Sequence, residues 1–378
     1  MKDFLSKAID SLAAKYAATP DEKNHYTSPE LARLEMEKKV VSTGVKPKFV
    51  FPKGAEVHSL QEACEVFPKE LQAALDKIIS RPVLPEHKFY AHAKLEALNS
   101  CGAYFVRVPA QTNAQLKILI PKTASKDFPA LFTIISVGAN SQMKVFEELG
   151  VCQGLCSTEV LCAQNSSTEV VSILTSPVQT KEIALFSQKR FFVQENASAQ
   201  SYSAFLGGGL VKAETEMVLQ ERGASSRDCQ AAFASGAQHF DLSSTARHEA
   251  PSTKAHSIVK SVLCDKGRVV LWGKIFIAKG AKQSDSFLSQ AAVMLNPGAR
   301  ADAMPILEIK ENDVRATHAS SVSHVDDNAL FYLNSRGIPT KEAKKTIAAS
   351  LLESAFEKST LQEGKDELDK MVELKWRA

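Results

Sequence analysis

The sequence lacks the short motifs by which most nucleotide-hydrolysing and peptide-hydrolysing enzymes are recognised. It contains no GxxxxGK[ST] phosphate loop, no GxGxxG after a strand, no HExxH and no GxSxG. The pair His248-Glu249 begins like a zinc-protease helix, but Pro251 follows and would break that helix. These absences exclude hydrolysis of ATP or peptides by any mechanism that depends on those motifs.

Long hydrophobic runs and a strong net charge are also missing. The longest mainly apolar run, residues 129–139, is far short of the roughly 20 residues that span a bilayer. The formal charge of +3 is too small to predict binding to nucleic acid or to a membrane surface. Asp3 and Asp10 interrupt the apolar N-terminal residues, which is typical of an amphipathic helix and not of a signal peptide. We therefore expect a cytoplasmic protein with no nucleic-acid or membrane partner.

Closely spaced cysteine pairs are absent as well. The seven cysteines are an odd number and include no CxxC pair, which favours reduced thiols over a disulfide framework. Cys152, Cys156 and Cys162 do form a loose group. Two interpretations of this group stay open: small buried apolar side chains, or a site for metal or sulfur.

Helical periodicity is present at both ends of the chain. Residues 1–85 are predicted to form a mostly helical module, with helices in the first 18 residues, in SPELARLEMEKKV and in SLQEACEVFPKELQAALDKII. A loop or short extended piece, GVKPKFVFPKG, lies between the last two. Residues 339–378 are predicted to form a second helical module.

Residues 86–338 change to short strand-like segments separated by glycine and proline. The run LVKAETEMVLQ alternates between apolar and polar residues, which predicts a half-buried strand. Similar strands are expected in RVVLWGKIFIA, DSFLSQAAVML and PILEI. Periodicity does not distinguish a sandwich, a barrel and a solenoid, and no repeat of fixed length is evident.

The predicted C-terminal helix has one apolar stripe that must be buried against something. It could cap the end of the strand-rich region, or it could dock a partner. The stripe consists of Ala343, Ile347, Ala348, Leu351, Leu352, Ala355 and Phe356.

An ordered series of segments from about residue 205 to 358 resembles a known family. The segments are FLGGGLVKAETEMVLQERGAS, AQHFDLSSTARHEAPSTKAHSIVKSVL, GKIFIAKGAKQSDSFLSQAAVMLNPGARADAMPILEIKENDVRATH and DDNALFYLNSRGI. They resemble the SufB/SufD family, whose members are subunits of the machinery that assembles iron-sulfur clusters. The resemblance implies a mainly β protein with a right-handed parallel β-helix core, flanked by N-terminal and C-terminal helical segments.

The resemblance is to the SufD branch in particular. SufB-like members usually have a cysteine before the Leu-Glu-Ile segment and a glutamate near the opening of the next motif, where SufD-like members have a histidine. This sequence has no cysteine after Cys264, and it has His318 at the position of the histidine. The resemblance implies that His318 is a ligand for iron or for a transient iron-sulfur cluster shared with SufB, with no tightly bound cofactor.

The residues around His318 leave its role open. A neutral imidazole is a good ligand for iron, but a single histidine lacks the other ligands that a metal needs and could equally be a hydrogen-bonded structural residue. The SufD motif often reads Cys-Ser-His-Gly-Ala-Thr, whereas Ala316 and Ala319 stand here in place of the cysteine and glycine. Thiolate ligation at this motif is therefore not expected.

The resemblance also implies partners. It predicts a heterodimer with a SufB-like subunit, a homodimer when the chain is alone, and docking of a SufC-like ABC-type ATPase on the turn and helices after the core. From the residues alone, the aromatics of that turn could instead seal the core while Arg336 satisfies exposed carbonyls. The predicted partner-binding residues are Phe331, Tyr332, Arg336, Gly337, Ile347, Leu351, Leu352 and Phe356.

The resemblance thus implies a non-enzymatic SufD-like subunit of an iron-sulfur cluster assembly complex. One alternative is a SufB-like homodimeric scaffold that accepts sulfur on its own cysteines. An alternative of another class is a β-helix enzyme acting on polysaccharide, which would need clustered carboxylates in a groove.

Overall fold

The computed structural model describes residues 46–80, 102–121, 130–150, 154–175 and 184–377. The helices predicted within residues 1–45 lie outside these ranges. The predicted helix in SLQEACEVFPKELQAALDKII is confirmed as two helices, α3 (Leu60–Val66) and α4 (Pro68–Ser80), because Pro68 ends the first helix and begins the second. A capping box fixes the start of α3, because the Ser59 and Glu62 side chains each accept a hydrogen bond from the other residue's backbone N–H.

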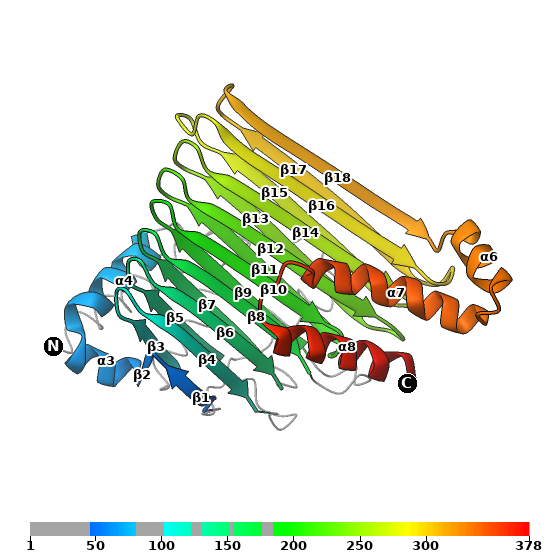
Figure 1. Cartoon of the computed structure of the whole chain (residues 1–378), viewed down its shortest axis with the longest axis horizontal. Coiled ribbons are helices and arrows are strands. Elements are labelled where there is room, and N and C mark those ends of the chain that lie inside the picture. Colours follow the sequence, from blue (N-terminus) through cyan, green and yellow to red (C-terminus); the bar gives the residue numbers. More distant parts are fainter. Residues whose placement is uncertain (1–45, 81–101, 122–129, 151–153, 176–183, 378) are drawn as a thin grey trace, which may run out of the picture.

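Eighteen strands among the described residues form two nine-stranded sheets (Figure 1). Sheet A consists of β1 (Lys48–Lys53), β4 (Asn113–Ile120), β6 (Gln142–Leu149), β8 (Ser167–Leu174), β10 (Ser198–Phe205), β12 (Ser225–Ala234), β14 (Lys254–Leu263), β16 (Ser284–Met294) and β18 (Val314–His324). Sheet B consists of β2 (Glu56–Ser59), β3 (Ala103–Val108), β5 (Ala130–Val137), β7 (Gly154–Cys162), β9 (Ala184–Val193), β11 (Leu210–Leu219), β13 (His239–His248), β15 (Arg268–Ile277) and β17 (Arg300–Ile309).

From β3 onward, successive strands alternate between the two sheets, and each pairs in parallel with the strand two positions later. The chain therefore winds as a flattened parallel β-solenoid, which confirms the predicted mainly β fold with a β-helix core. Paired residues in neighbouring coils are between 25 and 32 positions apart, as for Gln142 with Ser167 and Arg268 with Arg300. This variation in coil length explains why the sequence shows no fixed repeat.

The turns between strands stack in the same way as the strands. Asn140, Asn165 and Asn196 occupy equivalent turns of three coils with φ between 52° and 58°, a left-handed conformation that asparagine tolerates. The Asn165 amide nitrogen donates to the Asn140 amide oxygen at 3.1 Å. In the next coil Gly223 (φ 74°) replaces asparagine, and a Cβ there would lie 2.2 Å from Oδ1 of Asn196. Glycine is thus required at this turn by both conformation and space.

The N-terminal boundary of the core differs from the predicted one. β1 and β2 lie within the region predicted as mostly helical, but they pair antiparallel with β4 and β3 and so extend the two sheets. The predicted loop or extended piece after Gly44 is partly β1. Helices α3 and α4 pack on the outer face of sheet B, where Leu71 and Leu75 contact Phe105 and other buried apolar side chains.

The predicted strand in LVKAETEMVLQ is confirmed as β11, but it is buried on both faces instead of half-buried. Four of its apolar residues, Val211, Ala213, Met217 and Leu219, face the solenoid interior. The opposite face, which carries Lys212 and Glu214, is also buried. The alternation of polar and apolar residues therefore reports side-chain direction correctly but not exposure.

The interior of the solenoid also contains charged side chains. Lys189 of β9 projects inward and donates from Nζ to Oγ of Ser203 at 2.9 Å. Burial lowers the pKa of Lys189, while Glu147 and Asp228 raise it. The interior of the solenoid is therefore not purely apolar, although the alternation of apolar and polar residues along the strands suggests that it would be.

Three further helices follow the last strand: α6 (Asp327–Ser335), α7 (Thr340–Phe356) and α8 (Gln362–Arg377). α7 and α8 lie across the outer face of sheet A (Figure 1), with Leu352 and Phe356 in one buried cluster with Tyr202 of β10. The apolar stripe of α7 thus covers the side of the solenoid and does not cap its end. None of the described helices has the length and apolar character needed to cross a membrane.

One buried carboxylate anchors the turn between α7 and α8. Glu169 of β8 accepts hydrogen bonds from Oγ of Ser359 at 2.6 Å, from the Thr360 backbone N–H at 2.8 Å and from the Thr360 hydroxyl. Because all three donors belong to the turn, this side chain connects the two C-terminal helices to the middle of sheet A.

We predict that Glu169→Ala lowers the free energy of unfolding by about 2 kcal/mol, because it leaves the buried Ser359 hydroxyl and the partly buried Thr360 donors without their acceptor. A urea titration followed by circular dichroism measures this value. The matched control is Glu148→Ala on the adjacent strand, whose partly exposed carboxylate lies 3.9 Å from Lys117 and should contribute less than about 1 kcal/mol. Equal losses for both variants would contradict the anchoring role.

Candidate functional site

The last two strands, β17 and β18, form the terminal coil, which ends both sheets. Each pairs on one side only among the described residues, β17 with β15 and β18 with β16. They have 10 and 11 residues and pair without a register shift. Long, regular, exposed edge strands of this kind are templates for pairing with another chain.

The opposite end of the solenoid is built differently. There β2 has only 4 residues, and β1 has a register shift between Val50 and Lys53. Short edge strands, irregular pairing and lysine side chains are the features by which proteins protect sheet edges. The two ends of the solenoid are therefore not equivalent, and the terminal coil is the candidate functional site.

Register shows which side chains of the terminal coil face the solenoid interior. His318 of β18 pairs with Leu288 of β16, which is fully buried in the interior beside Ile275. The His318 side chain therefore lies on the inward face, at the open end of the interior, where no described coil covers it. Leu288 fills the space over Gly273, since a Cβ on that glycine would lie 2.5 Å from the leucine side chain.

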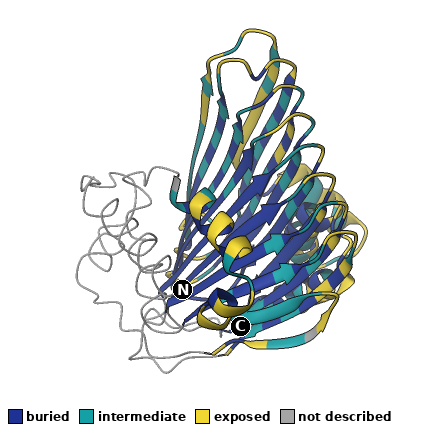
Figure 2. Cartoon of the chain, turned by 90° about the vertical axis from the view of Figure 1, so that its left-hand side faces the viewer, coloured by how far each residue is buried: buried dark blue, intermediate teal, exposed yellow. Residues whose placement is uncertain are grey.

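Exposed apolar side chains concentrate at this end of the molecule. Figure 2 shows mostly buried strands through the middle coils and more exposed residues toward the end where the terminal coil lies. Of the eight large hydrophobic side chains that are exposed among the described residues, six belong to β17, β18 and α6. These six are Ile306, Leu307, Ile309, Val322, Phe331 and Tyr332.

His318 by itself offers one metal ligand. No group of three or more His, Cys, Asp or Glu side chains suited to a metal ion occurs among the described residues. His324 is on the same face of β18, but six residues of extended chain put it about 20 Å away, too far to bind the same ion. A metal bound at His318 would therefore need ligands from beyond the described residues of this chain.

α6 projects from the solenoid with no buried residue. Asp326 caps its N-terminus by accepting a hydrogen bond from the Asn328 backbone N–H at 2.9 Å. Phe331 is 74% exposed and Tyr332 57%, so these aromatics do not seal the core. The Arg336 guanidinium lies 5.3 Å from the centre of the Tyr332 ring, a cation-π contact that orders the exposed pair.

Gly337 has a structural role in this projection. Its φ of 83° allows a Schellman ending of α6, in which Gly337 N–H donates to Asn334 and Ile338 N–H donates to Leu333. Glycine is the residue that adopts this conformation without strain. The turn thus sets the direction in which α7 returns to sheet A.

The four predicted partner-binding residues of α7 differ in exposure. Leu352 and Phe356 are buried against sheet A, whereas Ile347 and Leu351 are partly buried at the margin of the same contact. Leu352 and Phe356 therefore support the helix in this conformation and present no surface to a partner. A docking face on α7 would consist of its exposed side together with α6.

Cys156 and Cys162, two members of the cysteine group predicted as a rival metal or sulfur site, are not brought together. Cys156 and Cys162 both face the solenoid interior from β7, at opposite ends of the strand, and both are buried. Burial raises the pKa of each thiol to about 12, which disfavours the reactive thiolate. Cys152 lies outside the described residues. This arrangement counts against sulfur transfer at Cys156 and Cys162.

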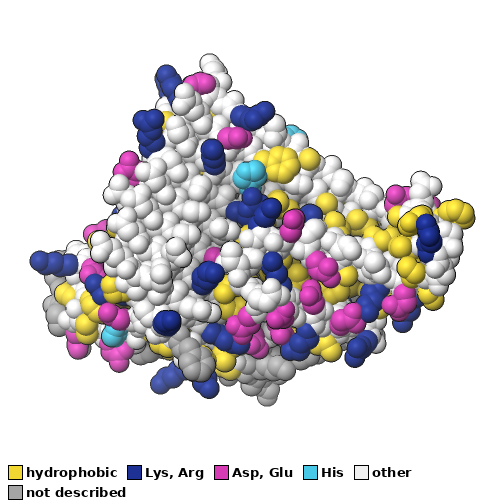
Figure 3. All heavy atoms as spheres, in the orientation of Figure 1, with side chains coloured by type: hydrophobic (Ala, Val, Ile, Leu, Met, Phe, Trp, Pro, Cys, Tyr) yellow, Lys and Arg dark blue, Asp and Glu magenta, His cyan; other side chains and the backbone are white. Residues whose placement is uncertain are grey.

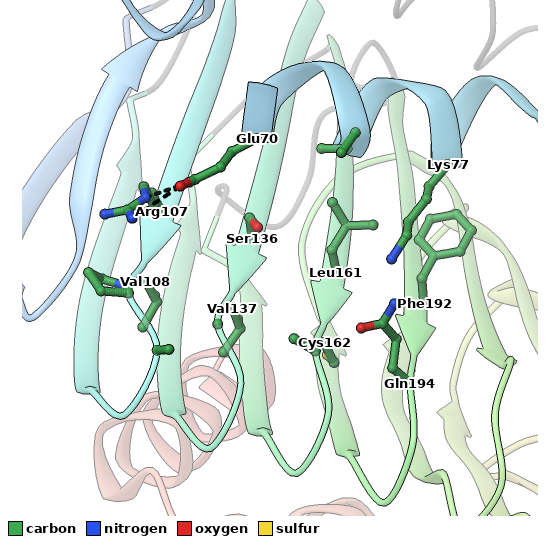
Figure 4. Close-up of a pocket in the computed structure, with 16 residues that line it drawn as sticks. Glu70, Lys77, Arg107, Val108, Ser136, Val137, Leu161, Cys162, Phe192 and Gln194 are labelled. Carbon is green, nitrogen blue, oxygen red and sulfur yellow. Dashed lines mark hydrogen bonds and ion pairs between the residues drawn. The ribbon is translucent and has the colours of Figure 1, made fainter. Parts of the chain in front are cut away.

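A concavity of about 360 Å³ lies between α4 and the ends of β3, β5, β7 and β9 (Figure 4). Its carboxylate, Glu70, accepts hydrogen bonds from Arg107, whose guanidinium also contacts Glu56. Lys77 points from α4 toward Gln194 across the cavity. With one carboxylate, already paired, this cavity lacks the two acidic groups that polysaccharide hydrolysis requires.

The fold and the site define a parallel β-solenoid protein whose last coil has free strand edges among the described residues. A search of family profiles matches residues 121–351 to the family described as SUF system FeS cluster assembly, SufBD core domain. The match covers more than half of the chain and includes β5 to β18 and most of α7. The chain belongs to this family.

Named relatives agree with this assignment. The chain is 29% identical over 182 residues to the iron-sulfur cluster assembly protein SufD of Escherichia coli, covering 47% of this chain and 43% of the relative. It is 30% identical over 184 residues to an iron-sulfur cluster assembly SufBD family protein of Staphylococcus epidermidis, covering 49% and 39%. Another such protein, from Mycobacterium bovis, is 35% identical over 143 residues, covering 38% and 17%. The matched stretch spans less than half the length of each relative.

Proposed function

We propose that this chain is a SufD-like, non-enzymatic subunit of a cytoplasmic complex that assembles iron-sulfur clusters. The terminal coil pairs with a SufB-like subunit, and α6 with the exposed side of α7 binds a SufC-like ATPase. The observation that carries the proposal is the terminal coil itself, whose two long strand edges have no partner within the described part of the chain and whose apolar side chains are exposed.

Pairing with another solenoid would provide the terminal coil with backbone hydrogen-bond partners and with a cover for its inward faces. A partner strand beside β18 would accept and donate the backbone hydrogen bonds that lack partners on that edge among the described residues. A further coil would also cover the inward faces of β17 and β18, as the neighbouring coils do elsewhere. The resulting interface would resemble a section through the solenoid core.

His318 lies at the place where such a partner would meet this chain. A ligand at a subunit boundary explains why the described residues supply one imidazole and no complete metal site. We propose that His318 binds iron or a nascent cluster together with ligands from the SufB-like subunit. Iron is here the cargo of the complex and not a resident cofactor of this chain.

We predict that Leu307→Glu combined with Val322→Glu prevents recovery of a complex with a SufB chain, since burying two unpaired carboxylates costs several kcal/mol. Copurification with tagged SufB and SufC measures this result. The controls are Val66→Glu and Leu374→Glu, which alter exposed apolar residues away from the terminal coil. Recovery of the complex with the terminal-coil variant would contradict the proposed interface.

α6 is tested in the same copurification. Phe331→Ala with Tyr332→Ala removes two exposed aromatics from a helix with no buried residue, so the fold should be unaffected. Exposed aromatic anchors typically contribute about 2 kcal/mol or more each at an interface, so we expect SufC to be lost while SufB is retained. Leu374→Ala on α8 is the control. Retention of SufC by the double variant would assign ATPase docking to another surface.

His318→Ala should leave the three-subunit complex intact and weaken its retention of iron by at least about tenfold. Mutation of a residue that only supports a metal ligand already lowers metal affinity by about tenfold or more, and loss of the ligand itself should cost at least as much. Iron and sulfide analysis after reconstitution measures the effect. The control is Thr317→Ala, the neighbouring residue whose side chain faces outward beside Phe287. Equal iron and sulfide contents in both variants would rule out the ligand role.

A further inference from the structure

The outer face of sheet A carries a second surface feature that the terminal coil does not account for. Because β12 to β18 pair in register, their outward side chains form rows across the sheet with neighbouring strands about 4.8 Å apart. One row places Arg227, His256 and Phe287 side by side. The next row places Lys254 beside Asp285, and Asp285 beside Arg315 on β18. We call Arg227, Lys254, His256, Phe287 and Arg315 the basic-aromatic patch.

α7 leaves this part of the sheet uncovered. The helix packs on β12 and β14, and together with α8 it forms one buried cluster with Cys229, Phe233 and Val262 in the C-terminal parts of these strands. The patch lies on the N-terminal halves of β12, β14, β16 and β18, with Lys254, His256 and Arg315 exposed. Figure 3 shows Lys and Arg side chains gathered around a histidine and a hydrophobic side chain on this face.

The patch has excess positive charge and an accessible ring pair. Arg227, Lys254 and Arg315 form no ion pair with any other described residue. Asp285 is the one acidic side chain in these two rows between β12 and β18. The His256 and Phe287 rings lie 6.2 Å apart at their centres. Burial lowers the pKa of His256, and the nearby cations contribute in the same direction. The rings are thus an apolar contact area bordered by cations.

We infer that the basic-aromatic patch binds an acidic segment of a partner protein that carries an aromatic residue. Carboxylates of such a segment would pair with Arg227, Lys254 and Arg315, while its aromatic side chain would pack on the rings of His256 and Phe287. Three cations over a few strands give an attraction suited to a short peptide. Nucleic acid usually requires more phosphate contacts than this patch could make, and the net charge of the chain is only +3.

The inference does not depend on pairing at the terminal coil. The patch lies on the face of sheet A, whereas the proposed SufB-like contact uses strand edges and inward-facing side chains. Failure of one interface would therefore leave the other intact. Arg315, on β18, is the point at which the two surfaces come closest.

The test uses the full chain and a fluorescein-labelled nine-residue peptide of glutamates and aspartates with one central tryptophan. Fluorescence anisotropy should show saturable binding. The binding should weaken as salt rises from about 20 to about 150 mM, because salt screens the attraction between exposed charges. Arg227→Glu with Lys254→Glu should weaken binding at least about tenfold. Lys266→Glu with Lys279→Glu, at exposed turn positions, is the matched charge control and should have no effect.

The aromatic contact is tested separately. Phe287→Ala should weaken binding of the tryptophan peptide several-fold but not of a peptide with alanine at that position, because only the first packs on the ring. Circular dichroism confirms that each variant folds. Equal binding to wild type and the Arg227/Lys254 variant would overturn the inference. So would tighter binding of a 15-base-pair DNA duplex than of the peptide, or equal effects of Phe287→Ala on both peptides.

Discussion

The structure depends on one constraint: each strand of the solenoid obtains its backbone hydrogen bonds from the coils before and after it. Among the described residues the middle coils meet this requirement on both sides, whereas the strands that end the two sheets pair on one side only. At the start, short and irregular antiparallel strands, β1 and β2, extend the sheets and give poor templates for pairing. At the end, β17 and β18 remain long and regular. The asymmetry between the ends gives the molecule one sheet end that is suited to strand pairing with another chain.

The C-terminal helices do not relieve that constraint. An amphipathic helix after a solenoid could cover its open end, yet α7 lies along the side of sheet A, and Glu169 holds the α7–α8 turn there. The terminal coil is left uncovered by these helices, and α6 projects beside it with Phe331 and Tyr332 exposed. The same chain ending thus provides two neighbouring but separate surfaces, one of strand edges and one of helix. That arrangement suits a subunit that links two different partners.

Parts of this organisation could be predicted from the sequence. The alternation in LVKAETEMVLQ gives the inward and outward faces of β11 correctly, because side-chain direction in a strand has a period of two. Burial of both faces was not predictable, since it depends on what covers the sheet from outside. The β-helix itself is implied by family resemblance and not by periodicity. Its coils vary in length from 25 to 32 residues, so the sequence contains no repeat of fixed length.

The candidate site, too, could be predicted only in part from the sequence. His318 could be singled out as an isolated histidine, but its inward direction at the open end depends on pairing with Leu288, which local sequence does not specify. The stripe of α7 was recognised, while the separation of buried Leu352 from partly buried Leu351 depends on how the helix rests on sheet A. The basic-aromatic patch was not predicted at all, because Arg227, His256 and Phe287 are about 30 residues apart in sequence and meet only through coil register.

The central claim is that the terminal coil is completed by another chain, and hydrogen exchange of its backbone amides tests this most directly. Mass-spectrometric exchange would compare the chain alone with its complex with a SufB chain. The account predicts that part of the amides of β17 and β18 exchange rapidly in the free chain and become protected in the complex, while those of β11 and β13 are protected in both. A complex that forms while exchange in β17 and β18 stays unchanged would contradict the account.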